Sequence, residues 1–160
     1  MTDELDKIDR RILAELQKDG RVTMTALAQR VGLSKSPCQQ RVRRLEERGY
    51  ILGYAALVDL ARLDAGHIAF VQVTLSDTTT PALDAFNRAV RKLPEVEQCH
   101  MIAGGFDYLL KVRTADIRAY RRSLGESLSS LPHVSHTSTY VVMESVKDRD
   151  VAEDRRGEGN

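Results

Sequence analysis

The stretch from Thr23 to Arg48 constrains the fold more than any other part of the chain. Its first half places apolar residues at Leu27, Ala28 and Val31, a spacing that predicts a short helix with one buried face. Gly32 follows directly, and a glycine can adopt the left-handed conformation that ends a helix. The pattern therefore predicts a helix that stops sharply at Gly32.

A second helix is predicted immediately after this turn. Ser34 suits the N-cap position, and Pro37 is tolerated in the first turn because amides there have no intrahelical acceptor. The expected buried stripe of this helix consists of Cys38, Val42 and Leu45. Two packed helices around a tight turn are typical of the helix-turn-helix motif, whose second helix enters the major groove of DNA.

The remaining positions of the second helix carry long polar side chains that suit phosphates and base edges. The predicted DNA-binding residues are Lys35, Ser36, Gln39, Gln40, Arg41, Arg43, Arg44 and Arg48. Gln39 and Gln40 are the candidates for adenine contacts, and Lys35 and Arg43 for guanine contacts. The candidates for phosphate contacts are Arg41, Arg44 and Arg48. An ordinary amphipathic hairpin with a solvated charged face is the plainer alternative.

The distribution of charge supports the DNA-binding interpretation, although the net charge of +1 does not. Residues 1–50 contain 11 lysines and arginines against 8 acidic residues, whereas residues 51–160 contain 13 against 15. A local basic patch can supply phosphate contacts in a protein that is nearly neutral as a whole.

Composition excludes several other classes of protein. The chain contains no run of eighteen apolar residues, and its charged start lacks the apolar centre of a signal peptide, so we expect a cytoplasmic protein without a membrane partner. Cys38 and Cys99 lie far apart, and the four histidines complete no zinc spacing. We therefore predict no metal site and no cofactor.

The hydrophobic pattern divides the chain into two domains. A helix from about Asp3 to Lys18 completes a three-helix module, Tyr50 to Val58 is expected to be extended, and Asp59 to Gly66 is turn-like. The predicted boundaries are 1–52 for the helix-turn-helix domain, 53–66 for the linker, 67–147 for a second domain, and 148–160 for a disordered tail.

The second domain alternates strands and helices in the order β-α-β-β-α-β. The expected elements are strands over 67–75, 96–102, 106–113 and 134–143, with a helix opening at 77–81 and another over 115–131. The last helix is expected to turn Ile117, Tyr120, Leu124, Leu128 and Leu131 inward. The predicted fold class is α+β, with a winged-helix-like N-terminal domain and a split βαβ, ferredoxin-like C-terminal domain.

Five segments carry a resemblance to a known family. They read IDRRILAELQKDGRV, VGLSKSPCQQRVRRLEERGYILGYAAL, FDYLLKVR, AYRRSLGESLSSLP and TYVVMESVK, in order from Ile8 to Lys147. The chain resembles the Lrp/AsnC family of feast/famine transcriptional regulators. The resemblance implies a strand linker, a C-terminal domain that senses amino acids, and homodimers that assemble further, commonly to octamers.

The resemblance also implies a site for a small amino-acid effector such as leucine. The family's loop Ser-Gly-Asp-aromatic-Asp corresponds here to residues 103–107, so that Gly104 and Asp107 match while Ala103 and Gly105 replace the serine and the first aspartate. A glycine backbone lets amides approach a ligand carboxylate, and an aspartate can pair with a ligand ammonium. The implied effector residues are Gly104, Gly105, Asp107, Ile117, Tyr140, Val141 and Val142. Without the resemblance, the paired glycines would suggest a plain hairpin turn.

These observations predict a sequence-specific regulator of amino-acid metabolism genes, modulated by an amino acid and associated with the nucleoid. One alternative is an architectural protein that binds DNA by shape and charge and ignores amino acids. The other is an enzyme, since some haem-pathway decarboxylases share this two-domain architecture. No catalytic arrangement of Ser/His/Asp, Cys/His or paired carboxylates stands out, so we predict that the chain is not an enzyme.

Overall fold

The computed structural model describes residues 5–147, which fall into two compact units divided between Ala56 and Leu57. Each unit has its own hydrophobic core. The tail predicted to be disordered, 148–160, and the first residues of the predicted N-terminal helix lie outside the described part.

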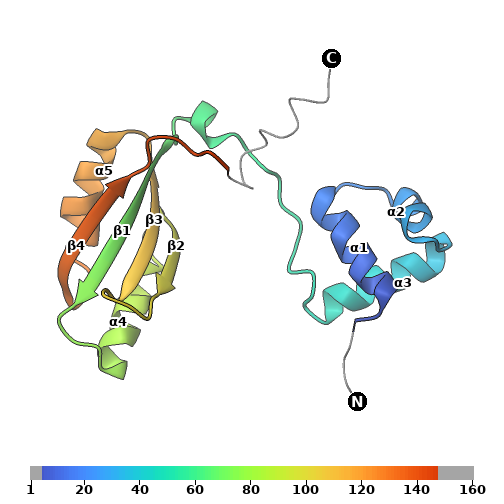
Figure 1. Ribbon diagram of the computed structural model, residues 1–160, viewed down its shortest axis with the longest axis horizontal. Coiled ribbons are helices and arrows are strands. Elements are labelled where there is room, and N and C mark those ends of the chain that lie inside the picture. Colours follow the sequence, from blue (N-terminus) through green and yellow to red (C-terminus); the bar gives the residue numbers. More distant parts are fainter. Residues whose placement is uncertain (1–4, 148–160) are drawn as a thin grey trace. The chain divides into compact units, whose positions relative to one another are not determined.

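The N-terminal unit consists of three helices: α1 (Lys7–Lys18), α2 (Met24–Val31) and α3 (Lys35–Glu47) (Figure 1). Their inward side chains form one core, and the predicted stripes of α2 and α3 are both buried in it. The buried members are Ile12, Leu27, Ala28, Val31, Cys38, Val42 and Leu45. The predicted packing of the helix-turn-helix is therefore confirmed.

Local capping decides where these helices begin and end. α1 begins at Lys7 and not at Asp3, because the Asp6 carboxylate accepts a hydrogen bond from the Asp9 N–H at 2.8 Å and so caps the first turn. Gly32 ends α2 in the predicted left-handed conformation, with φ 77°. Ser34 occupies the predicted N-cap position of α3, but its side chain makes no capping hydrogen bond.

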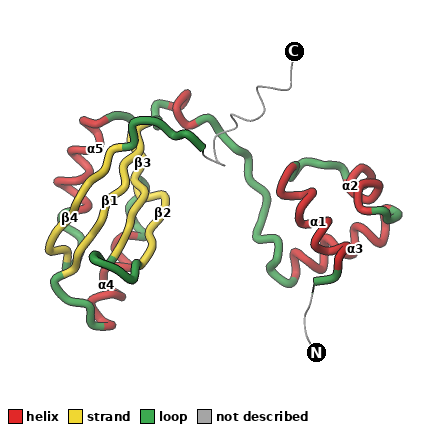
Figure 2. The backbone as a smooth tube through the Cα atoms, in the orientation of Figure 1, coloured by secondary structure: helices red, strands yellow, loops and turns green. Residues whose placement is uncertain are grey.

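The linker differs from the expected strand. Residues 52–59 have no regular secondary structure, and Leu60–Leu63 forms a short 3₁₀ turn (Figure 2). A strand needs a neighbour for its N–H and C=O groups, and the described part of a single chain offers this segment none. Leu52, Tyr54, Leu57 and Val58 consequently remain exposed.

The C-terminal unit contains one antiparallel sheet in the order β2-β3-β1-β4. Its strands are β1 (His67–Leu75), β2 (Val96–Met101), β3 (Tyr108–Thr114) and β4 (Val134–Val141). With helices between β1 and β2 and between β3 and β4, this order is the predicted ferredoxin-like topology.

Both helices of this unit cover the same face of the sheet (Figure 1). α4 (Thr80–Val90) contributes Phe86 and Val90 to the core, and the α5 region contributes Tyr120, Leu128 and Leu131. The Phe86 and Tyr108 rings lie 4.4 Å apart, centroid to centroid. Within residues 5–147, no helix covers the opposite face of the sheet.

The last helix is shorter and less regular than the single helix predicted over 115–131. α5 spans only Ile117–Ser123, because the Asp116 carboxylate accepts from the Ala119 N–H at 2.7 Å and caps the helix there. A π-helical turn, Leu124–Leu128, continues it, and Gly125 within that turn is a poor α-helix former. Ile117 does not turn inward as expected, since it is 46% exposed.

The last strand ends at Val141, two residues earlier than predicted, although the Val142 N–H still donates to the Ile68 carbonyl at 2.9 Å. Among residues 5–147, no helix is long and apolar enough to cross a membrane.

Candidate DNA-binding face and effector site

The outer face of α3 displays most of the predicted DNA-binding side chains to solvent. Cys38, Val42 and Leu45 fix the rotation of the helix by burying its inner stripe. The exposed residues of the opposite face are Lys35, Ser36, Gln39, Gln40 and Arg43. Each turn of this face therefore presents a hydroxyl, amide or cationic donor, the side chains that read base edges and phosphates.

Two predicted phosphate-binding arginines are instead engaged with α1. Arg41 Nη1 lies 2.8 Å from Asp9 Oδ1, and Arg44 Nη2 lies 2.8 Å from Asp9 Oδ2. Asp9 is only 3% exposed, so both of its oxygens are used inside the domain. The two arginines thus fasten α3 to α1, a role that the sequence analysis did not assign to them.

Asp6 extends this cluster at the start of α1. Its carboxylate lies 2.5 Å from Arg41 Nη1. The hydrogen bond from the Asp9 N–H, followed by that from Arg41, lowers the pKa of Asp6 below its ordinary value. Hydrogen bonds to Asp6 and Asp9 in turn raise the pKa of Arg41. The Arg41 guanidinium and the Asp6 carboxylate therefore remain charged at neutral pH.

The end of α3 is more exposed. Arg43 pairs with Glu47 one turn later at 2.8 Å, and both side chains are mostly in solvent. Exposed pairs of this kind contribute little to stability, so Arg43 can exchange Glu47 for a DNA partner at small cost. Arg48 is also exposed and lies at the C-cap of the helix.

The start of the linker is tied to α3. The Tyr54 hydroxyl donates to Glu46 Oε1 at 2.9 Å, and a Cβ at Gly20 would lie 3.6 Å from the Tyr54 ring. Tyr54 is exposed over about half of its surface, and the partial burial of the rest, followed by the hydrogen bond to Glu46, raises its pKa to about 12. The tie fixes the direction in which the chain leaves the DNA-binding unit.

This tie predicts a loss of stability in strong base. Because folding raises the pKa of Tyr54 from 10.0 to about 12, its contribution is complete below pH 10 and disappears as the pH rises toward 12. Amide hydrogen exchange at α3, measured across this range in wild type and Tyr54→Phe, checks the prediction. The wild type should lose protection relative to the variant, and an identical pH dependence would contradict it.

The predicted effector loop joins β2 to β3. The Ile102 N–H donates to the Asp107 carbonyl at 2.8 Å, which closes the loop around Gly104 and Gly105. Neither glycine has the positive φ that demands glycine, and a Cβ at Gly105 would meet no atom within 4 Å. An aspartate would fit at position 105, so the backbone does not force the loss of the family's first acid.

Asp107 has a structural contact of its own. Its Oδ2 accepts a hydrogen bond from the Leu75 N–H at 2.7 Å, and its own N–H donates to the Val73 carbonyl at 2.9 Å. The side chain thereby holds the end of β1 against the loop. A ligand ammonium at Asp107 would share this carboxylate with the Leu75 N–H.

The other implied effector residues lie at the far end of the sheet. Val141 pairs with Ala69 and Tyr140 with Phe70, at the beginning of β1, whereas the loop contacts Val73 and Leu75 at its end. Four residues of strand separate the two places, or roughly 13 Å. Tyr140 and Val141 are 54% and 46% exposed.

Ile117 belongs to the same end of the sheet as Tyr140, because it follows Thr114, which pairs with His67. Val142 is half-buried beside Ile68. One chain therefore brings Ile117, Tyr140, Val141 and Val142 to one end of the sheet and Gly104, Gly105 and Asp107 to the other. In residues 5–147, no group of three histidine, cysteine or acidic side chains could hold a metal ion.

Family models match both units. A winged helix-turn-helix DNA-binding model matches residues 5–51, and the Lrp/AsnC ligand binding domain matches residues 68–152. The chain is 61% identical over 147 residues to the proline dehydrogenase transcriptional activator of Rhizobium radiobacter, covering 92% of this chain and 94% of the relative. It is 54% identical over 144 residues to the leucine-responsive regulatory protein of Escherichia coli (strain K12), covering 90% and 88%.

Solved structures agree. A transcriptional regulator from Neisseria meningitidis in complex with L-methionine superposes with a TM-score of 0.85 at 36% identity, covering 91% of this chain and 94% of that one. A feast or famine regulatory protein from M. tuberculosis, also complexed with L-methionine, gives 0.84 at 36% identity, covering 91% and 97%. The chain therefore belongs to the Lrp/AsnC family of transcriptional regulators.

Proposed function

We propose that this protein binds DNA through the exposed face of α3 and regulates genes of amino-acid metabolism in response to a small amino acid. The observation that carries the proposal is the row of exposed donors on a helix whose opposite side is buried and whose flank is fastened to α1. A helix fixed in this way can place side chains against base edges reproducibly.

The residues divide into three groups. Gln39 and Gln40 suit adenine, and Lys35 and Arg43 suit guanine. Ser36 and Arg48 supply phosphate contacts from the two ends of α3. Arg41 and Arg44 act mainly by positioning the helix, because Asp9 already holds both of them.

The effector site needs a second copy of the chain. The glycine loop with Asp107 and the cluster around Tyr140 lie at opposite ends of one sheet, so one ligand cannot contact both within a single chain. Two neighbouring copies can bring unlike ends together. The relatives solved with L-methionine support an amino acid as the ligand, and leucine remains a second candidate.

Assembly into dimers, and further toward octamers, is supported by the uncovered face of the sheet. Phe70 and Leu109 are half-buried there and Tyr140 is exposed, with no helix above them. Apolar side chains on a sheet face without a covering layer can form part of an interaction surface. The exposed apolar side chains of the linker add to the surface that a second copy could cover.

The proposed targets are genes of amino-acid catabolism. The relative from Rhizobium radiobacter is called a proline dehydrogenase transcriptional activator, which makes the proline dehydrogenase gene the first target to test. A regulator of such genes acts on the bacterial chromosome, so we place it in the cytoplasm, associated with the nucleoid. Membership of a family of regulators also supports a non-enzymatic role.

Fluorescence anisotropy tests the proposal by comparing binding to target and scrambled DNA, with and without amino acids. Wild type should prefer the target, and the double variant Gln39→Ala/Gln40→Ala should lose about 1–3 kcal/mol per lost base contact on the target only. Gln17→Ala is the matched control, because it truncates an exposed glutamine of α1 outside the proposed contacts.

Two outcomes would contradict this result. An equal loss of affinity for target and scrambled DNA would mean that the two glutamines contact the phosphate backbone and not the bases. Equal binding of both DNAs by wild type, unaffected by any amino acid, would favour the alternative of an architectural protein. The replacements at Ala103 and Gly105 in the effector loop are the reason to consider that alternative.

A further inference from the structure

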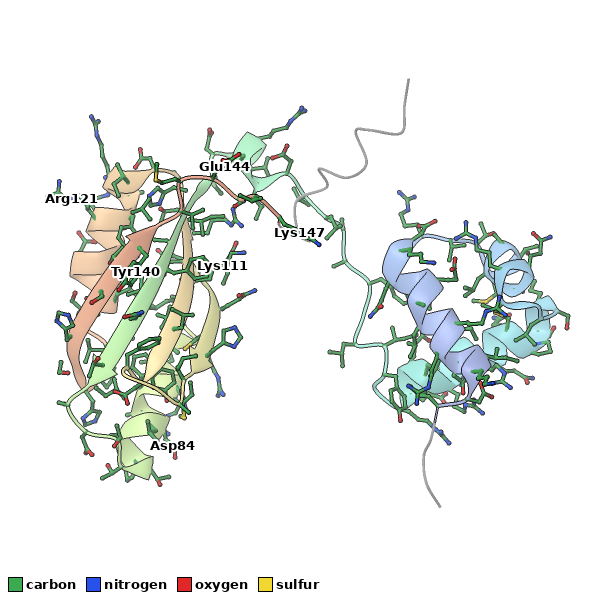
Figure 3. All side chains as sticks on the ribbon, viewed as in Figure 1. Asp84, Lys111, Arg121, Tyr140, Glu144 and Lys147 are labelled. Carbon is green, nitrogen blue, oxygen red and sulfur yellow. The ribbon has the colours of Figure 1, made fainter. Side chains whose placement is uncertain are left out.

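A cluster of three arginines occupies the outer surface of α5. Arg118, Arg121 and Arg122 line one hollow of about 330 Å³. Arg118 lies three residues before Arg121 and four before Arg122, so the three side chains share one face within one helical turn. All three are exposed, and Arg121 extends away from the sheet (Figure 3). We refer to these residues as the α5 cluster.

The α5 cluster is not neutralised within residues 5–147. Like charges one turn apart repel each other, and no ion pair in this part of the chain joins any of the three to a carboxylate. Asp116 directly precedes α5, and its pKa is lowered mainly by the hydrogen bond from the Ala119 N–H and partly by Arg122 and Arg118. Its carboxylate already caps the helix, so the hollow retains excess positive charge.

A second basic triplet in the same unit offers a comparison with the α5 cluster. Arg88, Arg91 and Lys92 of the α4 region have the same spacing and are also exposed. Arg91, however, lines a different hollow beside β2, together with Glu97 and Cys99. An acid therefore shares the surroundings of this triplet, whereas the residues of the described part of the chain that line the hollow on α5 are all arginines.

We propose that the α5 cluster binds the phosphate backbone of DNA and extends the contact with DNA to the effector-binding unit. Guanidinium groups match phosphate oxygens in a bidentate geometry, and three of them within one turn suit one or two neighbouring phosphates. Such contacts hold the DNA without reading its sequence. The inference rests on the proposed DNA-binding function.

The position of the cluster gives this contact a regulatory meaning. α5 begins with Ile117, an implied effector residue, and continues directly into the α5 cluster. An amino acid that changes the position of α5 would change the affinity of the α5 cluster for the DNA backbone. Binding of long DNA would reciprocally change the affinity of the protein for the amino acid.

The test compares full-length triple variants on two duplexes that share one target site. Arg118→Gln/Arg121→Gln/Arg122→Gln removes the cluster, and Arg88→Gln/Arg91→Gln/Lys92→Gln removes the same charge from α4. The short duplex, about 25 base pairs, covers two half-sites one helical turn apart. The long duplex, about 150 base pairs, adds flanking DNA of one persistence length.

On the long duplex, the α5 variant should reduce the slope of log affinity against log salt by about 1–2, since the cluster suits one or two phosphates and each lost phosphate contact removes about 0.9. The α4 variant should match wild type there, and all three proteins should bind the short duplex alike. The charge-preserving variant Arg118→Lys/Arg121→Lys/Arg122→Lys should recover most of the lost slope.

Equal slopes for the α5 and α4 variants on the long duplex would overturn the inference. So would a slope for the α5 variant that falls by the same amount on the short duplex as on the long one. If the triple variant does not fold, Arg121→Gln and Arg122→Gln singly carry the test, with a slope change of about 0.9 each. A wild-type protein that binds neither duplex would overturn the proposed function itself, and the inference with it.

Discussion

Replacing Asp9 with alanine should lower the free energy of unfolding of the N-terminal unit by about 1–3 kcal/mol. The reason is that Asp9 is 3% exposed and accepts a hydrogen bond from Arg41 and another from Arg44, both at 2.8 Å. Without it, Arg44 loses its partner on α1, while Arg41 keeps only Asp6. Native-state hydrogen exchange at α1 and α3 measures the change and separates it from the C-terminal unit.

Glu47→Ala is the matched control, because Glu47 also accepts from an arginine of α3. The Arg43–Glu47 pair is largely exposed, so its loss should change stability by no more than about 0.5 kcal/mol. Equal effects of the two substitutions would mean that Asp9 contributes no more than an exposed pair. The proposed fastening of α3 to α1 would then be wrong.

The same cluster decides between two roles for Arg41. If this arginine mainly positions the helix, Arg41→Ala should reduce the protection of α3 and leave the salt dependence of DNA binding nearly unchanged. If it holds a phosphate, the salt slope should fall by about 0.9 without loss of protection. Measuring both quantities on one variant distinguishes the two roles.

Local patterns predicted the helix-turn-helix well because its information is local. The spacing of apolar residues predicted the buried stripes, and Gly32 marked the end of α2. Local patterns could not predict the ion pairs that hold α3 against α1, since Asp9 lies 32 residues from Arg41 and 35 from Arg44. Charged residues at such separations can pair in many ways, and only the fold selects one.

The C-terminal unit shows the same division between local and distant information. Alternating apolar residues predicted all four strands and their order, with ends that differ by a few residues. They could not predict the register, which places Tyr140 opposite Phe70 and hence far from the glycine loop. The linker failed as a predicted strand for a related reason, because strand formation depends on a partner that its own sequence does not specify.

Asp107→Asn should abolish the response to the amino acid while leaving both the fold and the affinity for DNA in place. The Asn side chain keeps a carbonyl oxygen that can accept from the Leu75 N–H, a hydrogen bond of 2.7 Å in the native protein. It loses the negative charge that the proposed ammonium contact requires. Anisotropy with target DNA, titrated with leucine and methionine, measures the response.

Asp107→Ala separates this role from the structural one. It should lose the response as well, but it also leaves the Leu75 amide without its partner, which should destabilise the C-terminal unit by about 1–3 kcal/mol. Hydrogen exchange at β1 measures that loss, and the asparagine variant should show little of it. A full amino-acid response in Asp107→Asn would mean that the carboxylate binds no ammonium, leaving Asp107 the single task of holding the loop against β1.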